Sequence, residues 1–516
     1  MTIMKKIFSI IALSAIIGIT GCKKDFLSLE VNPNTPSVAT PQFQLSGTLA
    51  VSANLYNANV VATGNGAISL TTGGYPATVG VWMGYWTPSG NYVPNSALNT
   101  NNFTNTAYQI FTQFYLNLSN YNDLVKKGTA DPTLVHFASI GKIMKAFEFQ
   151  TLVDTYNNVP YTDAFKAPDV LFPKYDSGES IYDDLIKQLD AAIAAIKAAP
   201  TSAVNPGTSD IVFKGTMANW IKFANTIKLR LAIRQWNKLP AKQAALKTAI
   251  LATSADGYVD ETFQVAANPG YTNDDANSGK QSPFWLSYGA NATGAVSLPG
   301  DYYKANNYAI TKLKNTNDPR LSRLYAPAPA PTDPAVPFFG NIYGSTAPSN
   351  NPKTSGIGPG LLTGPTMNAV LMSSAESLFL QSEAAVYSIL PGNAQSLYEK
   401  GITASFTALT VPNAATAAAA YYGQAINNVS WTASTDKVQA IIVQKWTALN
   451  GYGNLEAYSE YRRTGFPSDI PVSTQSTQPT IPSRIFYPAT ELSNNGDNVK
   501  AQGTINQFTS KIFWAK

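Results

Sequence analysis

The chain has 516 residues, of which 44% are hydrophobic and 13% are charged, against about 25% charged residues in an average soluble protein. Its 36 basic and 31 acidic residues nearly balance, and no block of Lys or Arg is long enough to follow a phosphate backbone, so nucleic acid is not expected as a partner. The single cysteine and single histidine exclude a cysteine-ligated cluster, a multi-histidine metal site and a disulfide within the folded body.

The same counts restrict catalysis. A serine triad would have to use His136, whose neighbours are typical of a helix face, and no GxSxG-type turn supports it. Glycoside hydrolysis stays open, because it needs only two suitably placed Asp or Glu side chains. We predict no catalytic residue, no metal site and no cofactor.

The first residues have the layout of a secretory leader. Lys5 and Lys6 precede an apolar run from Ile7 to Ile19, which is shorter than the roughly 20 residues that a membrane span requires. Cys22 directly follows a small residue, as in a bacterial lipobox. The sequence therefore predicts a lipoprotein signal peptide over 1–21, lipidation of Cys22 and a flexible tether over 22–41. The alternative is an ordinary secretory signal with a spare cysteine.

The body, residues 42–516, alternates between helical patterns and long polar segments. Apolar residues recur at helical spacing from Ile181 to Ile196, and Asp176 with Glu179 resembles a capping arrangement before them. Similar stripes predict further helices within 134–147, 220–231, 375–386, 397–409 and 438–449. Short breaks between consecutive helices favour antiparallel pairs. We therefore expect a mainly α fold, a solenoid-like body of tetratricopeptide-like helix pairs with long irregular loops and loop-rich insertions near 57–105 and 265–365.

Aromatic residues gather in these non-periodic segments, interleaved with Gly, Ser and Asn. Their rings could stack on the apolar face of a pyranose while neighbouring amides bind its hydroxyls. The alternative is that each ring pins its own loop to the helical core. The stretches are "GVWMGYWTPSGNY", "SPFWLSYGAN" and "GDYYKANNY", which includes Tyr308, and the candidate ligand-binding residues are Trp82, Tyr85, Trp86, Trp285, Tyr288 and Tyr302.

Six segments, in order along the chain, carry a family resemblance. They are "CKKDFLSLEVNPNTPS", "VDTYNNVPYTDAF", "NDPRLSRLY", "AESLFLQSEAA", "QKWTALNGYGNLEAYSEYRRTGFP" and "RIFYPATELSNNG". Together with the lipobox they make the chain similar to the SusD/RagB family of nutrient-binding outer-membrane lipoproteins from Bacteroidetes, in its SusD-like group. The second segment departs from the family pattern where Asn157 replaces a glycine.

The resemblance implies four tetratricopeptide-like helix pairs decorated by loops, on a lipid-anchored protein at the extracellular face of the cell outer membrane. It also implies a role: to cap a SusC-type TonB-dependent transporter and to bind an oligosaccharide or peptide for import, without catalysis. Two other functions remain open from the residues, a lipid-anchored glycoside hydrolase with a carboxylate pair and a helical scaffold without a small ligand. For Arg462 and Arg463, we expect pairing with buried acids or capping of carbonyls rather than ligand contact.

Overall fold

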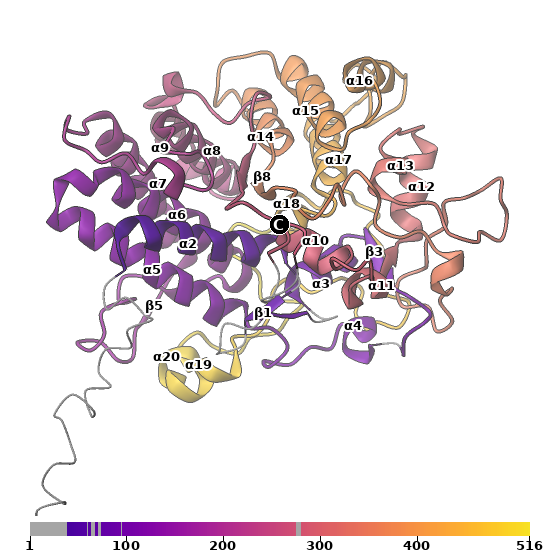
Figure 1. The fold of residues 1–516 in the computed structure, drawn as a ribbon, viewed down its shortest axis with the longest axis horizontal. Helices are drawn as coiled ribbons and strands as arrows, with labels where there is room; N and C mark the ends of the chain where they lie inside the picture. The colour runs from indigo at the N-terminus through magenta and orange to yellow at the C-terminus, as the bar shows by residue number, and fades with distance from the viewer. Residues whose placement is uncertain (1–38, 59, 63–67, 71–73, 94, 275–279) are drawn as a thin grey trace, which may run out of the picture.

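The computed structural model describes residues 39–58, 60–62, 68–70, 74–93, 95–274 and 280–516 (Figure 1). The predicted leader, Cys22 and nearly all of the predicted tether lie outside these residues. Among the helices in the described ranges, none combines the length and the hydrophobicity needed to cross a bilayer.

The first half of the chain forms a body of successively packed helices, at the left of Figure 1. α5, α6, α7 and α8 each contact the next one along the chain, α2 packs against α5, and α9 packs against α8. The bounds are α2 (Pro41–Asn57), α5 (Ile110–Ala130), α6 (Val135–Tyr156), α7 (Gly178–Lys197), α8 (Met217–Trp236) and α9 (Gln243–Leu251).

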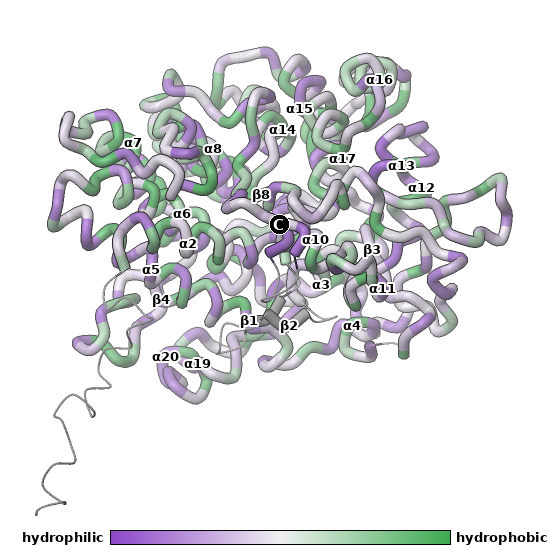
Figure 2. Tube along the Cα trace, viewed as in Figure 1, coloured by the Kyte–Doolittle hydropathy of each residue, from purple (hydrophilic) through white to green (hydrophobic). Residues whose placement is uncertain are grey.

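α7 illustrates why these helices form. Its apolar residues from Ile181 to Ile196 recur at helical spacing and are buried, as the sequence predicts, and Figure 2 shows hydrophobic and hydrophilic residues alternating along such helices. The predicted cap is corrected by the structure. The Ser177 hydroxyl accepts the amide hydrogen of Ser180 and so caps the helix, whereas Asp176 accepts from the backbone amides of Tyr161 and Thr162.

A second helical group follows in the C-terminal half, at the top of Figure 1. α14 contacts α15 and α17, α15 contacts α16, and α17 contacts α18, while α14 also packs on α8 and joins the two groups. The consecutive pairs α5–α6, α7–α8, α14–α15 and α17–α18 confirm the predicted α-helical body of tetratricopeptide-like pairs. The bounds are α14 (Ser374–Val386), α15 (Ala394–Ala408), α16 (Ala414–Tyr422), α17 (Lys437–Leu449) and α18 (Asn454–Thr464).

The loop-rich segments hold short elements that are paired across long sequence distances. β3 (Trp86–Pro88) pairs antiparallel with β7 (Tyr303–Ala305), and β6 (Val265–Ala267) pairs antiparallel with β8 (Ala369–Met372). The first pairing fastens the two predicted insertions to each other. The remaining short elements are α3 (Tyr75–Trp82), α4 (Ser96–Thr100), α10 (Pro283–Tyr288), α11 (Leu298–Tyr302), α12 (Asn307–Asn315), α13 (Leu321–Leu324), α19 (Ala489–Asn494) and α20 (Gly496–Lys500), with strands β1 (Val60–Ala62), β2 (Ile68–Leu70), β4 (Val159–Pro160) and β5 (Tyr175–Asp176).

A carboxyl group is buried where α2, α5 and α6 meet. Oε1 of Glu148 accepts hydrogen bonds from the Ser52 hydroxyl at 2.6 Å and from the Asn117 amide at 2.7 Å. No Lys or Arg of the described residues forms an ion pair with it. Burial in this uncharged setting raises the pKa of Glu148 to about 8. The side chain is therefore mostly protonated at neutral pH.

Candidate functional site

The structure buries the aromatic side chains of the first predicted stretch. Trp82, Tyr85 and Trp86 are each 0% exposed. The Trp82 indole donates to Oδ1 of Asn101 at 3.0 Å, and the Tyr85 hydroxyl donates to the carbonyl of Trp446 on α17 at 2.6 Å. These rings therefore hold residues 82–86 against the helical body, as the anchoring alternative expects.

The aromatic residues of the second and third stretches differ in their exposure. Tyr288 and Tyr302 are buried, each 4% exposed, whereas Trp285 on α10 is half-buried. The Trp285 indole donates to the carbonyl of Ala290 at 2.7 Å, which fixes the ring beside the turn that follows α10. Of the six predicted ligand-binding residues, Trp285 has the most ring surface facing solvent. Its contact with a ligand stays a prediction.

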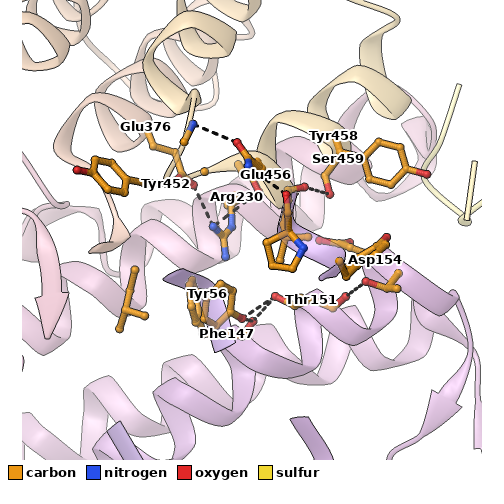
Figure 3. A pocket seen from close by; sticks show the side chains of 18 of the residues that line it. Tyr56, Phe147, Thr151, Asp154, Arg230, Glu376, Tyr452, Glu456, Tyr458 and Ser459 are labelled. Atoms are coloured by element: carbon orange, nitrogen blue, oxygen red, sulfur yellow. Dashed lines mark hydrogen bonds and ion pairs between the residues drawn. The ribbon is translucent and has the colours of Figure 1, made fainter. Parts of the chain in front are cut away.

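Three of the six family-like segments instead meet α8 in a buried network of ion pairs, part of which is drawn in Figure 3. Arg230 on α8 pairs with Glu376 on α14 at 2.9 Å, and Arg234, one turn later on α8, pairs with Glu456 on α18 at 2.6 Å. Arg234 also pairs with Asp154 on α6. The other members, joined by further ion pairs, are Glu383, Lys445, Glu460 and Arg463. The network thus links α6, α8, α14, α17 and α18.

The expectation for the two consecutive arginines is confirmed. Arg463 donates to both carboxylate oxygens of Glu383, at 2.7 and 2.8 Å, and also pairs with Glu460. Arg462 donates to the backbone carbonyls of Asp154 at 2.6 Å and of Ser483 at 3.1 Å. Both guanidinium groups therefore serve the packing of α18 against its neighbours.

The charges of the network affect its carboxyl groups differently. Burial by itself would raise the pKa of Glu456, but the charges of Arg234, Lys445 and Arg230 hold it well below the ordinary value. For Glu376, burial and the nearby charge of Glu456 dominate, and its pKa is raised. The interior of this region is therefore strongly charged, and most of its charged groups are paired with one another, although Nε of Arg234 has no hydrogen-bond partner.

A small cavity lies beside this network, lined by side chains that include Tyr56, Phe147, Arg230 and Glu456 (Figure 3). Its volume is about 50 Å³. Pockets for drug-sized ligands typically measure about 300–1,000 Å³, so this cavity has room for water but not for a sugar ring. We assign it to the packing of the body.

A larger concave site lies on the loop-rich side, around α12. This groove has a volume of about 500 Å³, within the range for small-molecule ligands. The Tyr308 hydroxyl donates to Oδ1 of Asp469 at 2.8 Å, and Lys312 pairs with Oδ2 of the same carboxylate at 2.8 Å. The lining also includes the exposed residues Asn307, Thr311, Asn315 and Ile342, together with Asn306 and Thr316.

The electrostatics of this groove keep Asp469 ionised. Partial burial opposes the charge, but hydrogen bonds from Lys312 and Tyr308 lower the pKa of Asp469 below its ordinary value. Burial, together with the hydrogen bond to Asp469, raises the pKa of Tyr308, which therefore stays a neutral donor. The groove thus offers an aromatic ring, a carboxylate acceptor, an ammonium and several amides.

The sequence pattern revealed only part of this groove. "GDYYKANNY" draws attention to Tyr308, and Lys312 lies four residues later on the same helix face. Asp469 lies 161 residues beyond Tyr308 in the chain, and no local pattern connects the two. Covariation between distant positions is the signal that could have indicated their contact.

A second open groove, of about 640 Å³, lies between α15 and residues 261–264. It carries two carboxylates, Glu261 and Glu399. Glu261 pairs with Lys400 at 2.7 Å, and the hydrogen bond from Lys400 lowers the pKa of Glu261. A glycosidase acid needs the opposite shift. Within the described ranges, no group of three or more His, Cys, Asp or Glu side chains is placed to hold a metal ion.

Comparison with known proteins agrees with this architecture. Similar solved structures are a chitin-binding SusD homolog from Flavobacterium johnsoniae (24% identity, TM-score 0.68, covering 91% of this chain and 98% of that one) and a SusD-like protein from Bacteroides thetaiotaomicron (21%, 0.68, 91% and 98%). A SusD homolog from Bacteroides uniformis is 20% identical, with a TM-score of 0.69, covering 92% of this chain and 99% of its own. No curated protein matches the sequence significantly.

The family model for SusD-like proteins, described as starch-binding and associating with the outer membrane, matches residues 63–488. This match spans well over half of the chain, and it includes the network segments and the α12 groove. The protein therefore belongs to the SusD-like family of outer-membrane-associated proteins.

Proposed function

We propose that this protein is a surface-exposed outer-membrane lipoprotein that binds a glycan nutrient, without catalysis, and caps a SusC-type TonB-dependent transporter for import. Family membership supports a nutrient-binding role at the outer membrane. The main support for a glycan as the ligand is the α12 groove, where Tyr308 and Asp469 lie among neutral amide side chains.

The chemistry of the groove favours a glycan over a peptide. Sugar hydroxyls both donate and accept hydrogen bonds, so they match a lining in which the Asp469 carboxylate accepts and the Lys312 ammonium donates. Amides such as those of Asn307 and Asn315 can do both. Tyr308 adds an apolar ring surface of the kind on which a pyranose packs.

A panel of oligosaccharides that includes starch and chitin fragments tests the ligand class. We expect the purified protein to bind at least one glycan, and Asp469→Asn to weaken that binding by about tenfold, because hydrogen bonds to a charged group contribute roughly 1.5–3 kcal/mol. Asp497→Asn, at a fully exposed position on α20, is the matched control and should leave the affinity unchanged. Isothermal titration calorimetry measures both. The proposal fails if no glycan binds or if the two variants behave alike.

The same panel separates binding from hydrolysis. The α12 groove has one carboxylate in its described lining, Asp469, whereas glycoside hydrolysis uses two. We therefore expect no reducing sugar to be released from any glycan that binds. Release of reducing ends by the wild-type protein, lost in Asp469→Asn, would replace this proposal with the hydrolase.

The anchor and the partner are tested together in cells. Tagged protein purified from detergent-solubilised outer membrane should carry lipid on Cys22 by mass spectrometry and should co-purify with a TonB-dependent transporter. Cys22→Ser should instead leave the protein outside the membrane fraction, because it removes the acceptor sulfur while the body offers no spanning helix in its described residues. A membrane-retained Cys22→Ser protein would contradict the lipid anchor, and recovery of the lipidated protein without a transporter would contradict the partnership.

A further inference from the structure

A fourth concave site, a cavity, lies on the helical body, where α5, α6 and α7 meet the loop that follows β4. Its volume is about 230 Å³, slightly below the range for drug-sized ligands, so it has room for one small ring. It is separate from the α12 groove and shares no lining residue with it. Its lining from α5, α6, α7 and the loop comprises Asn122, Val125, Lys142, Lys145, Ala146, Phe149, Tyr161, Thr162, Ala164, Phe165, Leu185 and Gln188.

Lys145 is a half-buried cation in this cavity. Its ammonium donates to Oδ1 of Asn122 at 2.7 Å and lies 5.6 Å from the centroid of the Phe165 ring. Across the described residues, no carboxylate lies within ion-pair distance of it, whereas most buried lysines are paired. Burial, reinforced by the charges of Lys142 and Lys126, lowers the pKa of Lys145 to about 8. An anion bound in the cavity would offset the free-energy cost of burying this unpaired ammonium.

The loop that covers the cavity is strained. Phe165 has a φ of 63°, in the left-handed region that bulky side chains rarely adopt. Such conformations cost about 1–3 kcal/mol and concentrate at ligand clamps and active sites. Here the strained residue is the one whose ring lies over the Lys145 ammonium. The buried ring of Phe149 lies 6.3 Å from Phe165 and 4.8 Å from Tyr161, centroid to centroid, and packs edge to face against both, which supports these two half-buried rings from below.

The charges around the cavity are mainly positive. Lys142 and Lys145 contribute positive charge from α6, and Lys126 does so from α5. Asp184 on α7 contributes negative charge, although its carboxylate accepts from the Tyr161 hydroxyl at 2.6 Å and from Gln188 at 3.3 Å. These three ammonium groups outweigh the one carboxylate, so the cavity favours an anion, and the carboxylate of a sugar unit supplies one.

We propose that this cavity is a second ligand site, which binds the carboxylate of an acidic sugar unit at Lys145 while the sugar ring packs on the half-buried rings of Tyr161 and Phe165. The small volume admits one ring, and the flat apolar rings beside a polar rim match a pyranose better than an extended peptide. The site would thus recognise uronate-type units. It does not depend on neutral glycans binding at the α12 groove.

Calorimetric titration of the full-length protein at low ionic strength, with glucuronate, galacturonate, glucose and N-acetylglycine as separate probes, tests this site. We expect at least one of the two uronates to bind and glucose and N-acetylglycine to bind at least tenfold more weakly. Lys145→Met, which keeps the apolar stem, should weaken uronate binding at least tenfold. Lys247→Met, at an exposed position on α9, is the matched control.

Two further readouts make the outcome decisive. Wild-type affinity for the uronate should fall as the pH rises above about 8, because Lys145 loses its charge there while the sugar carboxylate keeps its own. Asp469→Asn, in the α12 groove, should leave uronate binding unchanged. The proposal for the α12 groove and the proposal for this cavity can therefore fail independently of each other. Equal binding of glucose, equal binding of N-acetylglycine or full affinity in Lys145→Met would each overturn the proposal.

Discussion

Replacement of Arg463 by alanine should lower the free energy of unfolding by about 3–5 kcal/mol, the cost of breaking a buried ion pair by removal of one partner. Arg463 donates to Glu383 at 2.7 and 2.8 Å and pairs with Glu460, and all three side chains are at most 4% exposed. The substitution leaves two carboxylates of α14 and α18 without their cation. Urea denaturation followed by circular dichroism measures the loss.

The matched control is Lys400→Ala. Lys400 pairs with Glu261 at 2.7 Å, but the two side chains are 51% and 44% exposed. Exposed pairs contribute at most about 1 kcal/mol, because water already solvates both charges. If the two variants lose the same stability, the buried network does not hold α18 in place. The network would then be only a consequence of packing.

Replacement of Glu148 by glutamine should change the pH dependence of stability. The folded state raises the pKa of Glu148 from 4.5 to about 8, so between these values the folded protein keeps a proton that the unfolded chain releases. The associated stability is complete below about pH 4.5 and is lost as the pH rises toward 8. Between pH 5 and 7.5 the wild type should lose about 3 kcal/mol relative to Glu148→Gln, at about 1.4 kcal/mol per pH unit.

Denaturant unfolding at a series of pH values from 5 to 8.5 measures this difference. Glutamine keeps the shape of the side chain and an oxygen that can accept from Ser52 and Asn117, so the comparison isolates the proton. Glu399→Gln, at a half-buried position on α15, is a control for removal of a carboxylate that water reaches. Parallel stability curves for Glu148→Gln and the wild type would mean that Glu148 is not held protonated.

The sequence predicted those parts of the fold that depend on local periodicity. α7 and α6 repeat apolar residues every three or four positions, and the structure buries these faces. The cap of α7 was wrong by one residue, because Ser177 and Asp176 are both common caps and only the tertiary contacts of Asp176 decide between them. The sequence analysis also expected Arg463 to pair with buried acids, and the structure shows its ion pairs with Glu383 and Glu460.

The candidate site was less predictable, because composition does not distinguish a ring that binds a ligand from one that fastens a loop. Trp82 and Trp285 both occur in stretches rich in aromatic residues, yet one is fully buried and the other half-buried. Asn157, which replaces the family's glycine, has a φ of 68°, a backbone conformation that favours glycine. Lys145 gives no signal in the sequence, since its isolation from carboxylates arises only when α5, α6 and α7 pack.

The pairing of β3 with β7 also bears on how the protein matures. The Thr87 hydroxyl donates to the carbonyl of Ala305, which lies 218 residues further along the chain. Contacts of such high sequence separation are slow to form, because a long loop must close first. While the chain emerges from its N-terminus during synthesis, Trp86 has no strand partner until residue 305 has emerged, whereas α5 and α6 can already pair. The loop-rich side that carries the α12 groove is therefore expected to be assembled last, on a helical body that is already formed.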